Sequence, residues 1–279
     1  MNPNSTIRAP FFEIGPKSYL YGDDILELAK AADAASEKYQ VDIIFTTPLV
    51  EIARVKATTK HIHVFAPHMD PLRPGRGLAD TLPESLVAVG AEGVMLNHAE
   101  KPLNISVLRE TILRADEVGL TTIVCADSVV EASMIARLNP NIIVAEPSEL
   151  IGTGITSGPE YVEASMRAVK DVNPDVLVLQ GAGISNGEDV YNTIFSGAEA
   201  TGSSSGVVKA PNRAAMVDEM ISAVRRAWDD RHRKSQNKRR IFYGIQSSTE
   251  RVRTEIKRMD SHLSLCNQRG ASDCKRIRH

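Results

Sequence analysis

Over the first 230 residues, short apolar runs alternate with longer stretches in which apolar residues recur every three or four positions. The first pattern is typical of buried strands, and the second is typical of amphipathic helices. Strands that alternate with helices along a chain indicate βαβ units, in which parallel strands form a sheet covered by helices. The sequence therefore predicts an α/β protein built on a parallel sheet.

Seven apolar runs are predicted strands, and an eighth strand is expected near residues 198–204. The seven are Phe11–Ile14, Val41–Phe45, His61–Ala66, Gly93–Leu96, Thr121–Ala126, Ile142–Ala145 and Val176–Leu179. The clearest helical stretches are Asp24–Tyr39, Asn104–Val118, Pro159–Val172, Gly187–Ser196 and Ala214–Asp230. Eight such units fit a closed (β/α)8 TIM barrel, which commonly takes about 250 residues. An open doubly wound sheet is the alternative, but no GxGxxG motif follows the first strand, which disfavours a dinucleotide-binding version.

The eighth strand has an unusual composition. Residues 198–205 read AEATGSSS, whereas a buried parallel strand is normally apolar. Either this strand is very short, or its side chains face a ligand.

Charge is distributed unevenly along the chain, whose net charge is −2. Residues 231–279 hold 14 Lys and Arg against 4 Asp and Glu, and residues 1–230 hold the remaining 19 against 31. This asymmetry predicts an acidic barrel domain over residues 1–230 and a basic C-terminal extension over residues 231–279, disordered or loosely attached. Within the extension, residues 251–263 have a modest apolar stripe that fits one helix. Nucleic-acid binding by the extension is disfavoured, because no aromatic residues are interleaved with its charges.

Nothing in the sequence predicts a membrane segment or a disulfide framework. No apolar run approaches the roughly 20 residues of a membrane helix. The N-terminus, MNPNSTIRAP, lacks the basic and apolar blocks of a signal peptide, so a cytoplasmic location is expected. Cys125, Cys266 and Cys274 form no zinc-type pair, and Cys125 is expected to be buried because it lies in an apolar run.

Charged and polar residues follow three of the predicted strands. Lys17 follows the first strand, His98 and Glu100 follow the fourth, and Glu146 follows the sixth. In a parallel barrel these positions share one mouth, where such enzymes hold their reactive groups. A carboxylate that removes a carbon-bound proton, an imidazole that polarises a carbonyl and a lysine that stabilises an enediolate suit proton transfer next to a carbonyl. Glu149 is an equal candidate for the carboxylate.

Glycine-rich turns follow the sixth, seventh and eighth strands. They contain Gly152 and Gly154, then Gly181 and Gly183, then the run Ser204–Gly206. Backbone N–H groups in such turns bind anions, and the loops after strands seven and eight commonly hold phosphate in this fold. The turns therefore predict a phosphorylated ligand.

Four runs resemble the triosephosphate isomerase family in its shorter archaeal form, within a likeness that spans residues 11–228. The runs are Leu96–Glu100, Glu146–Gly154, Gly181–Asp189 and Ser205–Ala210. The resemblance implies that Glu146 is the catalytic base, His98 the electrophile and Lys17 the strand-one lysine. It also implies that Gly183, Ser204 and Ser205 hold the phosphate group, and that residues 147–155 form a lid that contains Ile151.

The resemblance implies an isomerase of glycolysis and gluconeogenesis that interconverts dihydroxyacetone phosphate and D-glyceraldehyde 3-phosphate through an enediolate. Such an enzyme needs no metal and no organic cofactor, and its partner is a small phosphorylated sugar. A homodimer or homotetramer is expected, with the loop of residues 67–80 at the interface.

Several positions depart from the family pattern. The Asn that normally lies two residues before the lysine is Gly15, followed by Pro16. The Ser after the catalytic His is Ala99, and the Gln before the strand-three His is Pro67. Gly15 is expected to contact the substrate, yet it lacks a side-chain donor. Two alternatives therefore stay open: a sibling aldose–ketose isomerase acting on a four-carbon sugar phosphate, and a non-catalytic phosphosugar-binding protein.

Overall fold

In the computed structural model, which describes residues 5–236 and Thr254, eight parallel strands pair in sequence order. β8 also pairs with β1, so the sheet closes on itself as a (β/α)8 barrel and the alternative of an open sheet is wrong. The strands are β1 (Phe11–Ile14), β2 (Asp42–Thr46), β3 (His63–Ala66), β4 (Gly93–Leu96), β5 (Thr121–Ala126), β6 (Ile142–Ala145), β7 (Leu177–Gln180) and β8 (Ala200–Ser203).

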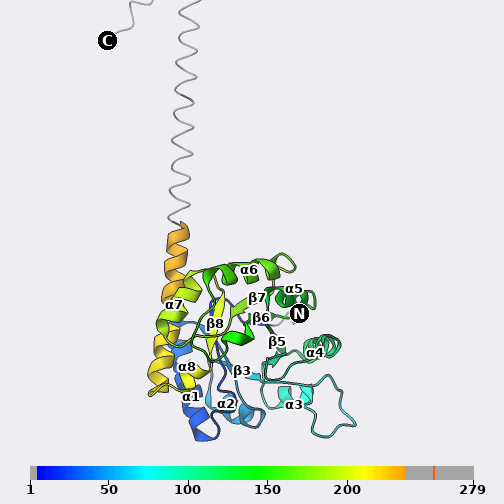
Figure 1. Cartoon of the computed structure of the whole chain (residues 1–279). Helices are drawn as coiled ribbons and strands as arrows, with labels where there is room; N and C mark the ends of the chain where they lie inside the picture. The colour runs from blue at the N-terminus through cyan, green and yellow to red at the C-terminus, as the bar shows by residue number, and fades with distance from the viewer. Residues whose placement is uncertain (1–4, 237–253, 255–279) are drawn as a thin grey trace, which may run out of the picture. The chain divides into compact units, whose positions relative to one another are not determined.

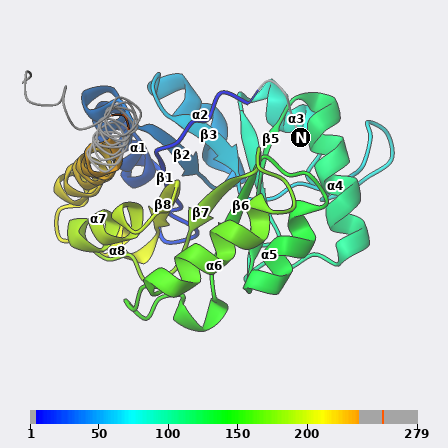
Figure 2. The ribbon, with the colours of Figure 1, turned by 90° about the horizontal axis from the view of Figure 1, so that it is seen from above.

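Helices follow the strands and surround the barrel (Figures 1 and 2). They are α1 (Asp23–Tyr39), α2 (Ile52–Thr58), α3 (Pro83–Ala88), α4 (Ile105–Val118), α5 (Val129–Ala136), α6 (Pro159–Lys170), α7 (Gly187–Phe195) and α8 (Ser205–Val208), with 3-10 turns η1 (Leu49–Glu51) and η2 (Ser148–Leu150). Residues 213–229 form a further helix.

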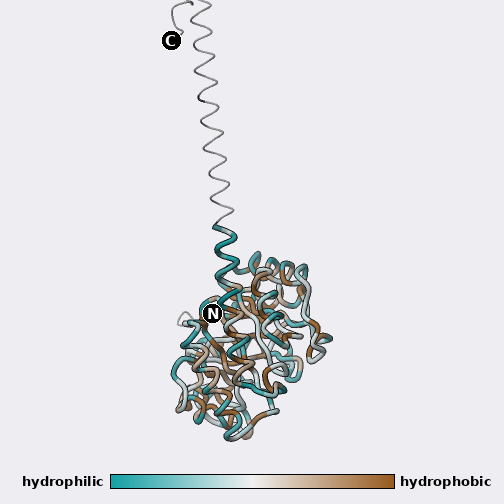
Figure 3. The backbone as a smooth tube through the Cα atoms, turned by 90° about the vertical axis from the view of Figure 1, so that its left-hand side faces the viewer, coloured by the Kyte–Doolittle hydropathy of each residue, from teal (hydrophilic) through white to brown (hydrophobic). Residues whose placement is uncertain are grey.

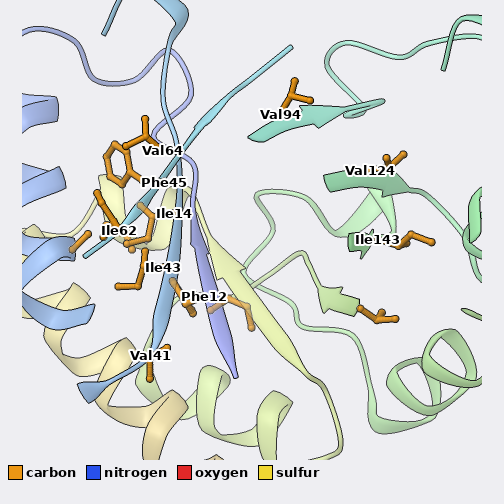
Figure 4. Close-up of a cluster of buried hydrophobic side chains, with 14 of the residues drawn as sticks. Phe12, Ile14, Val41, Ile43, Phe45, Ile62, Val64, Val94, Val124 and Ile143 are labelled. Carbon is orange, nitrogen blue, oxygen red and sulfur yellow. The ribbon is translucent and has the colours of Figure 1, made fainter. Parts of the chain in front are cut away.

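Alternation of side chains along the strands creates two apolar layers. On β1, Phe12 and Ile14 belong to the large cluster between strands and helices, part of which is drawn in Figure 4. Phe11 belongs instead to the smaller cluster that fills the barrel, together with Phe65 and Ile123. Because successive residues of a strand point to opposite faces, Glu13 points into the barrel as Phe11 does. Cys125 is buried in the same inner cluster, which confirms that prediction.

Most strand boundaries agree with the prediction, but β3 begins at His63, two residues later than predicted, and β2 and β7 are each shifted by one residue. β2 and β7 begin and end one residue later than predicted, at the polar residues Thr46 and Gln180, which are buried and extend the strands beyond their apolar runs. β8 has four residues, as most of the other strands do. Its polar side chains are satisfied by the backbone: Thr201 Oγ1 donates to Gln180 O at 2.8 Å and Ser203 Oγ donates to Ile184 O at 2.8 Å.

The chain divides into two units, Met1–Asp229 and Asp230–His279. In the first unit, hydrophobic and hydrophilic stretches are interleaved (Figure 3). In the second, residues 230–236 and Thr254 are helical, and the remainder of the predicted extension, including most of the helix predicted over residues 251–263, lies outside the described residues. None of the helices in the described part of the chain is long and apolar enough to cross a membrane.

Candidate active site at the carboxyl ends of the strands

A pocket of about 720 Å³ lies at the carboxyl ends of the strands. Every site residue predicted from the sequence lines it: Gly15, Lys17, His98, Glu146, Ile151, Gly183, Ser204 and Ser205. Glu149 does not line this pocket and is exposed. The geometry therefore separates the two candidate carboxylates and leaves Glu146 inside the pocket.

Glu146 follows β6 directly and is held on two sides. Its backbone N–H donates to Ala126 O at 3.0 Å, which continues the pairing between β5 and β6, and its Oε1 accepts from Ala182 N at 3.1 Å. A Cβ atom at Gly181 would come within 2.8 Å of the Glu146 side chain, so the glycine leaves room for the carboxylate. Burial raises the pKa of Glu146, and the charge of Lys17 opposes this rise. A carboxylate with a raised pKa is a stronger base than an exposed one.

His98 is positioned by its neighbour Asn97 in the loop after β4. Asn97 has a positive φ of 57°, its Nδ2 donates to Cys125 O at 3.0 Å, and its Oδ1 accepts from Leu103 N at 2.9 Å. The His98 ring accepts at Nδ1 from Glu100 N at 3.1 Å. In a neutral ring this leaves the proton on Nε2. Burial, and then the charge of Lys17, lower the pKa of His98, which favours that neutral form.

The reactive groups face one another across the pocket. His98 Nε2 lies 3.8 Å from Glu146 Oε2, which is beyond hydrogen-bond distance. Lys17 has a positive φ of 49°, and its Nζ lies 3.0 Å from Glu100 Oε1. The spacing leaves Glu146 and His98 free to contact adjacent atoms of one small substrate, with a cation beside them.

The predicted phosphate-holding positions also lie together. Gly183 has φ +76°, and a Cβ atom there would come within 2.0 Å of Ile155 O. The Ser204 hydroxyl donates to Gly15 O, and α8 begins at Ser205. N–H groups at the start of a helix lack partners within the helix, so this edge of the pocket suits an anion.

The segment after Glu146 is mostly exposed. Ser148 N donates to Asp127 Oδ1 at 2.6 Å, and Gly152 and Gly154 both have φ +75° with no atom within 4 Å of an added Cβ. Ile155 is 62% exposed although its side chain is apolar. A segment with few contacts and an exposed apolar side chain fits a lid that gains contacts when a ligand is bound.

Glu13 is a charged residue of the pocket that the predictions did not include. Glu13 lies within β1 and lines the pocket floor, but it was overlooked because the run FFEI was interpreted only as a strand. The available signal was a carboxylate inside a four-residue strand that is otherwise apolar. Among the described residues, no group of three or more His, Cys, Asp or Glu side chains is arranged to hold a metal ion.

Comparison with known proteins identifies the relatives of this chain. The sequence model of the triosephosphate isomerase family matches residues 16–207. The triosephosphate isomerase of Methanocaldococcus jannaschii is 39% identical over 206 residues, covering 73% of this chain and 94% of that protein. The enzyme of the same name from Sulfurisphaera tokodaii is 35% identical over 227 residues, covering 80% and 99%. That of Methanothermus fervidus is 37% identical over 204 residues, covering 72% and 91%.

Proposed function

Because the chain belongs to the triosephosphate isomerase family, we propose that the pocket at the carboxyl ends of its strands is the active site, with Glu146 as base, His98 as electrophile and Lys17 as the stabilising cation. The protein is an aldose–ketose isomerase that interconverts dihydroxyacetone phosphate and D-glyceraldehyde 3-phosphate, a reaction of glycolysis. Nothing in the site favours a four-carbon substrate or a loss of catalysis.

The proposed mechanism follows from the positions of three atoms. The Glu146 carboxylate removes a proton from the hydroxyl-bearing carbon next to the carbonyl and returns it to the former carbonyl carbon, while the hydroxyl proton passes to the former carbonyl oxygen. The His98 Nε2–H group donates to the carbonyl oxygen, where negative charge develops as the enediolate forms. Lys17 adds its positive charge beside that oxygen. A glutamate base and a neutral histidine are the established arrangement in this family. The observation that supports the assignment is the convergence of these side chains in one pocket, 3.8 Å apart for the base and the electrophile.

The phosphate group is assigned to the turns after β7 and β8. Gly183, Ser204 and Ser205 line that edge of the pocket, and Ile151 lines it from the lid. An enediolate phosphate readily loses its phosphate group, so a closed lid has to exclude water while the intermediate exists. In this proposal the exposed segment after Glu146 performs that closure.

Replacing Glu146 by Asp tests the assignment of the base. The shorter side chain withdraws the carboxylate by about one bond, and a misplacement of about 1 Å costs about 100-fold in rate. We expect kcat for both triose phosphates, and exchange of the substrate's carbon-bound proton with deuterated water, to fall by about that factor. Glu149→Asp is the matched control, because Glu149 is exposed and outside the pocket. Full activity in Glu146→Asp together with a loss in Glu149→Asp would assign the base to Glu149.

The proposal extends to the organisation of the whole chain. We assign catalysis to residues 1–230 and treat residues 231–279 as a separate basic extension. Membership of the family supports a homo-oligomer, either a dimer or a tetramer, and a cytoplasmic location. Light scattering coupled to gel filtration measures the first, and fractionation of cells that produce the protein measures the second.

A further inference from the structure

Glu13 is an unusual residue for its place in the fold. Its side chain points into the barrel, where its inner-cluster neighbours are apolar, and it is 8% exposed. The pocket floor around it is formed by Thr46, Met95, Cys125, Val144, Leu179 and Gly202. Burying a carboxyl group without partners costs free energy, so a carboxyl group retained at this depth needs an explanation.

The Glu13 carboxyl group occupies space that two glycines leave open. A Cβ atom at Gly15 would lie 2.9 Å from Glu13 Oε1, and a Cβ atom at Gly202 would lie 3.2 Å from Glu13 Oε2. Gly202 is also the register partner of Glu13 on β8. The carboxyl group therefore reaches up the strand to position 15, which lies at the pocket wall and has no side chain of its own.

One oxygen of this group lacks a partner. Among the described residues, neither Glu13 Oε1 nor the neighbouring Thr46 Oγ1 makes a hydrogen bond of good geometry, although the Thr46 hydroxyl lies close enough to Glu13 to influence its pKa. Glu13 lines the pocket together with Lys17, His98 and Glu146, so a small shift of its buried carboxyl group would let a molecule bound there satisfy it.

We propose that Glu13 is a substrate-binding residue, whose carboxyl group hydrogen-bonds an oxygen on the carbon chain of the bound triose phosphate and supplies the polar group that position 15 lacks. The proposal rests on the active site assigned above. It makes Glu13 and Gly15 a matched pair, since the carboxyl group of one fills the place of a side chain at the other.

The neutral form of Glu13 is the one suited to this task. Burial raises the pKa of Glu13 to about 7; the Thr46 hydroxyl lowers it, the negative charge of Glu146 raises it and Lys17 lowers it. A protonated carboxyl group donates a hydrogen bond to a carbonyl or enediolate oxygen, whereas an ionised one repels the developing negative charge. Glu146 is less buried and accepts a hydrogen bond from Ala182 N, which favours ionisation at Glu146. The pair thus combines a charged base with a neutral donor.

The pH dependence of kcat/KM follows from this division. Activity rises as pH increases through the pKa of Glu146, and falls as pH increases further through about 7, where Glu13 ionises. Besides Glu13 and Glu146, the pocket contains further titratable side chains, namely Lys17 and Tyr19 after β1, His68 after β3, His98, Glu100 and Lys101 after β4, and Cys125 within β5. The pocket residues of β2, β7 and β8 nearest Glu13 carry no charge. Substitution at Glu13 is therefore needed to assign the alkaline limb.

Glu13→Gln is the conservative variant. It keeps the shape and offers an N–H donor at every pH, so we expect activity to persist while the decline above pH 7 disappears. Glu13→Val removes the donor, and we expect kcat/KM for both triose phosphates to fall about 10- to 100-fold at pH 6.5. Circular dichroism and thermal melting verify that each variant is folded. The proposal is overturned if Glu13→Val retains wild-type kcat/KM, or if Glu13→Gln keeps the wild-type pH profile, because Glu13 then only fills space or binds water.

A swap between the two positions gives a second, independent test. In the native background Gly15→Asn should lower activity, because its Cβ would meet Glu13 Oε1 at 2.9 Å. The nearest atoms to that Cβ all belong to the Glu13 carboxyl group, so Glu13→Val makes room for the amide. Adding Gly15→Asn to Glu13→Val should then restore kcat/KM at least about 10-fold. If Gly15→Asn changes kcat/KM in the same direction in the native protein and in Glu13→Val, the proposed pairing of Glu13 with Gly15 is contradicted. Absence of turnover by the native protein would instead refute the proposed active site itself.

Discussion

At the scale of single residues, Gly183 shows why the phosphate-binding turn requires glycine. Its φ of +76° lies in the left-handed region, and a Cβ atom would come within 2.0 Å of Ile155 O in the lid. A left-handed conformation costs an L-residue about 1–2 kcal/mol. The atoms that this Cβ would meet belong to the backbone, so the clash cannot be relieved by rotating a side chain, and the backbone itself has to move.

Gly183→Ala is therefore expected to raise KM for both triose phosphates by about 10-fold or more, because the end of the lid and the turn after β7 are forced apart. Gly119→Ala is the matched control: Gly119 has φ +82° at the C-terminal cap of α4, and no atom lies within 4 Å of its added Cβ. The control should lower the free energy of unfolding by about 1 kcal/mol without changing KM. Equal KM values in the two variants would mean that Gly183 does not shape the site.

A site residue could be predicted from the sequence where the residues flanking it form a recognisable motif or strand. Glu146 lies in a run that also contains the glycines of the lid, and His98 follows a clear strand, so both could be located. Choosing Glu146 over Glu149 on the residues alone was not possible, because the direction of a side chain in a loop depends on tertiary contacts such as the bond from Ala182 N. The relation between Glu13 and Gly15 was invisible for the same reason, since it needs the distance between them.

At the scale of elements, the start of α7 joins helix stability to the shape of the site. Asn186 caps α7, its Oδ1 accepting from Glu188 N at 2.8 Å and Asp189 N at 3.0 Å. Asp189 Oδ2 in turn accepts from Ser185 N at 2.9 Å and Ser185 Oγ at 2.7 Å. The cap thus fixes the turn that carries Gly183.

Asn186→Ala should lower the free energy of unfolding by about 1 kcal/mol and also raise KM several-fold, because the turn loses its anchor. Asn104 caps α4 in the same way, accepting from Val107 N at 3.0 Å, and lies away from the pocket. Asn104→Ala should show a similar loss in urea unfolding with an unchanged KM. If both variants have the native KM, the cap of α7 serves the helix alone.

Elements were predictable from the sequence where they are long enough to show a period. α1 has 17 residues and α4 has 14, and both were located within one residue at each end. α2, α3 and α5 have 7, 6 and 8 residues, and none was located, because two turns give too few positions for a helical period to appear. β8 was predicted only by the eightfold pattern, since its polar side chains bond to neighbouring backbone in a way that no local pattern reveals.

At the scale of the whole molecule, the charge asymmetry separates two parts with different sequence character. The family match ends at residue 207, before the basic extension begins, and the relatives are covered to 91–99% of their own length. The helix over residues 213–229 also lies beyond the family match, but it is part of the barrel domain, because it buries Val217, Met220, Ile221 and Val224. Its apolar face belongs to the core around the barrel.

Deleting residues 234–279 should leave kcat and KM for both triose phosphates within about twofold of the native values, because no residue of the pocket is removed. A deletion that begins at residue 217 should not yield a folded protein, since each buried aliphatic side chain lost costs about 2–5 kcal/mol. Steady-state kinetics and thermal melting of the two truncated chains measure these outcomes.

Duplex DNA titrated against the full chain at low salt tests the extension for polyanion binding, and we expect none. Salt-dependent DNA binding that disappears on deleting residues 234–279 would show that the extension binds polyanions. A large loss of isomerase activity on the same deletion would show that residues 1–230 are not the whole catalytic unit.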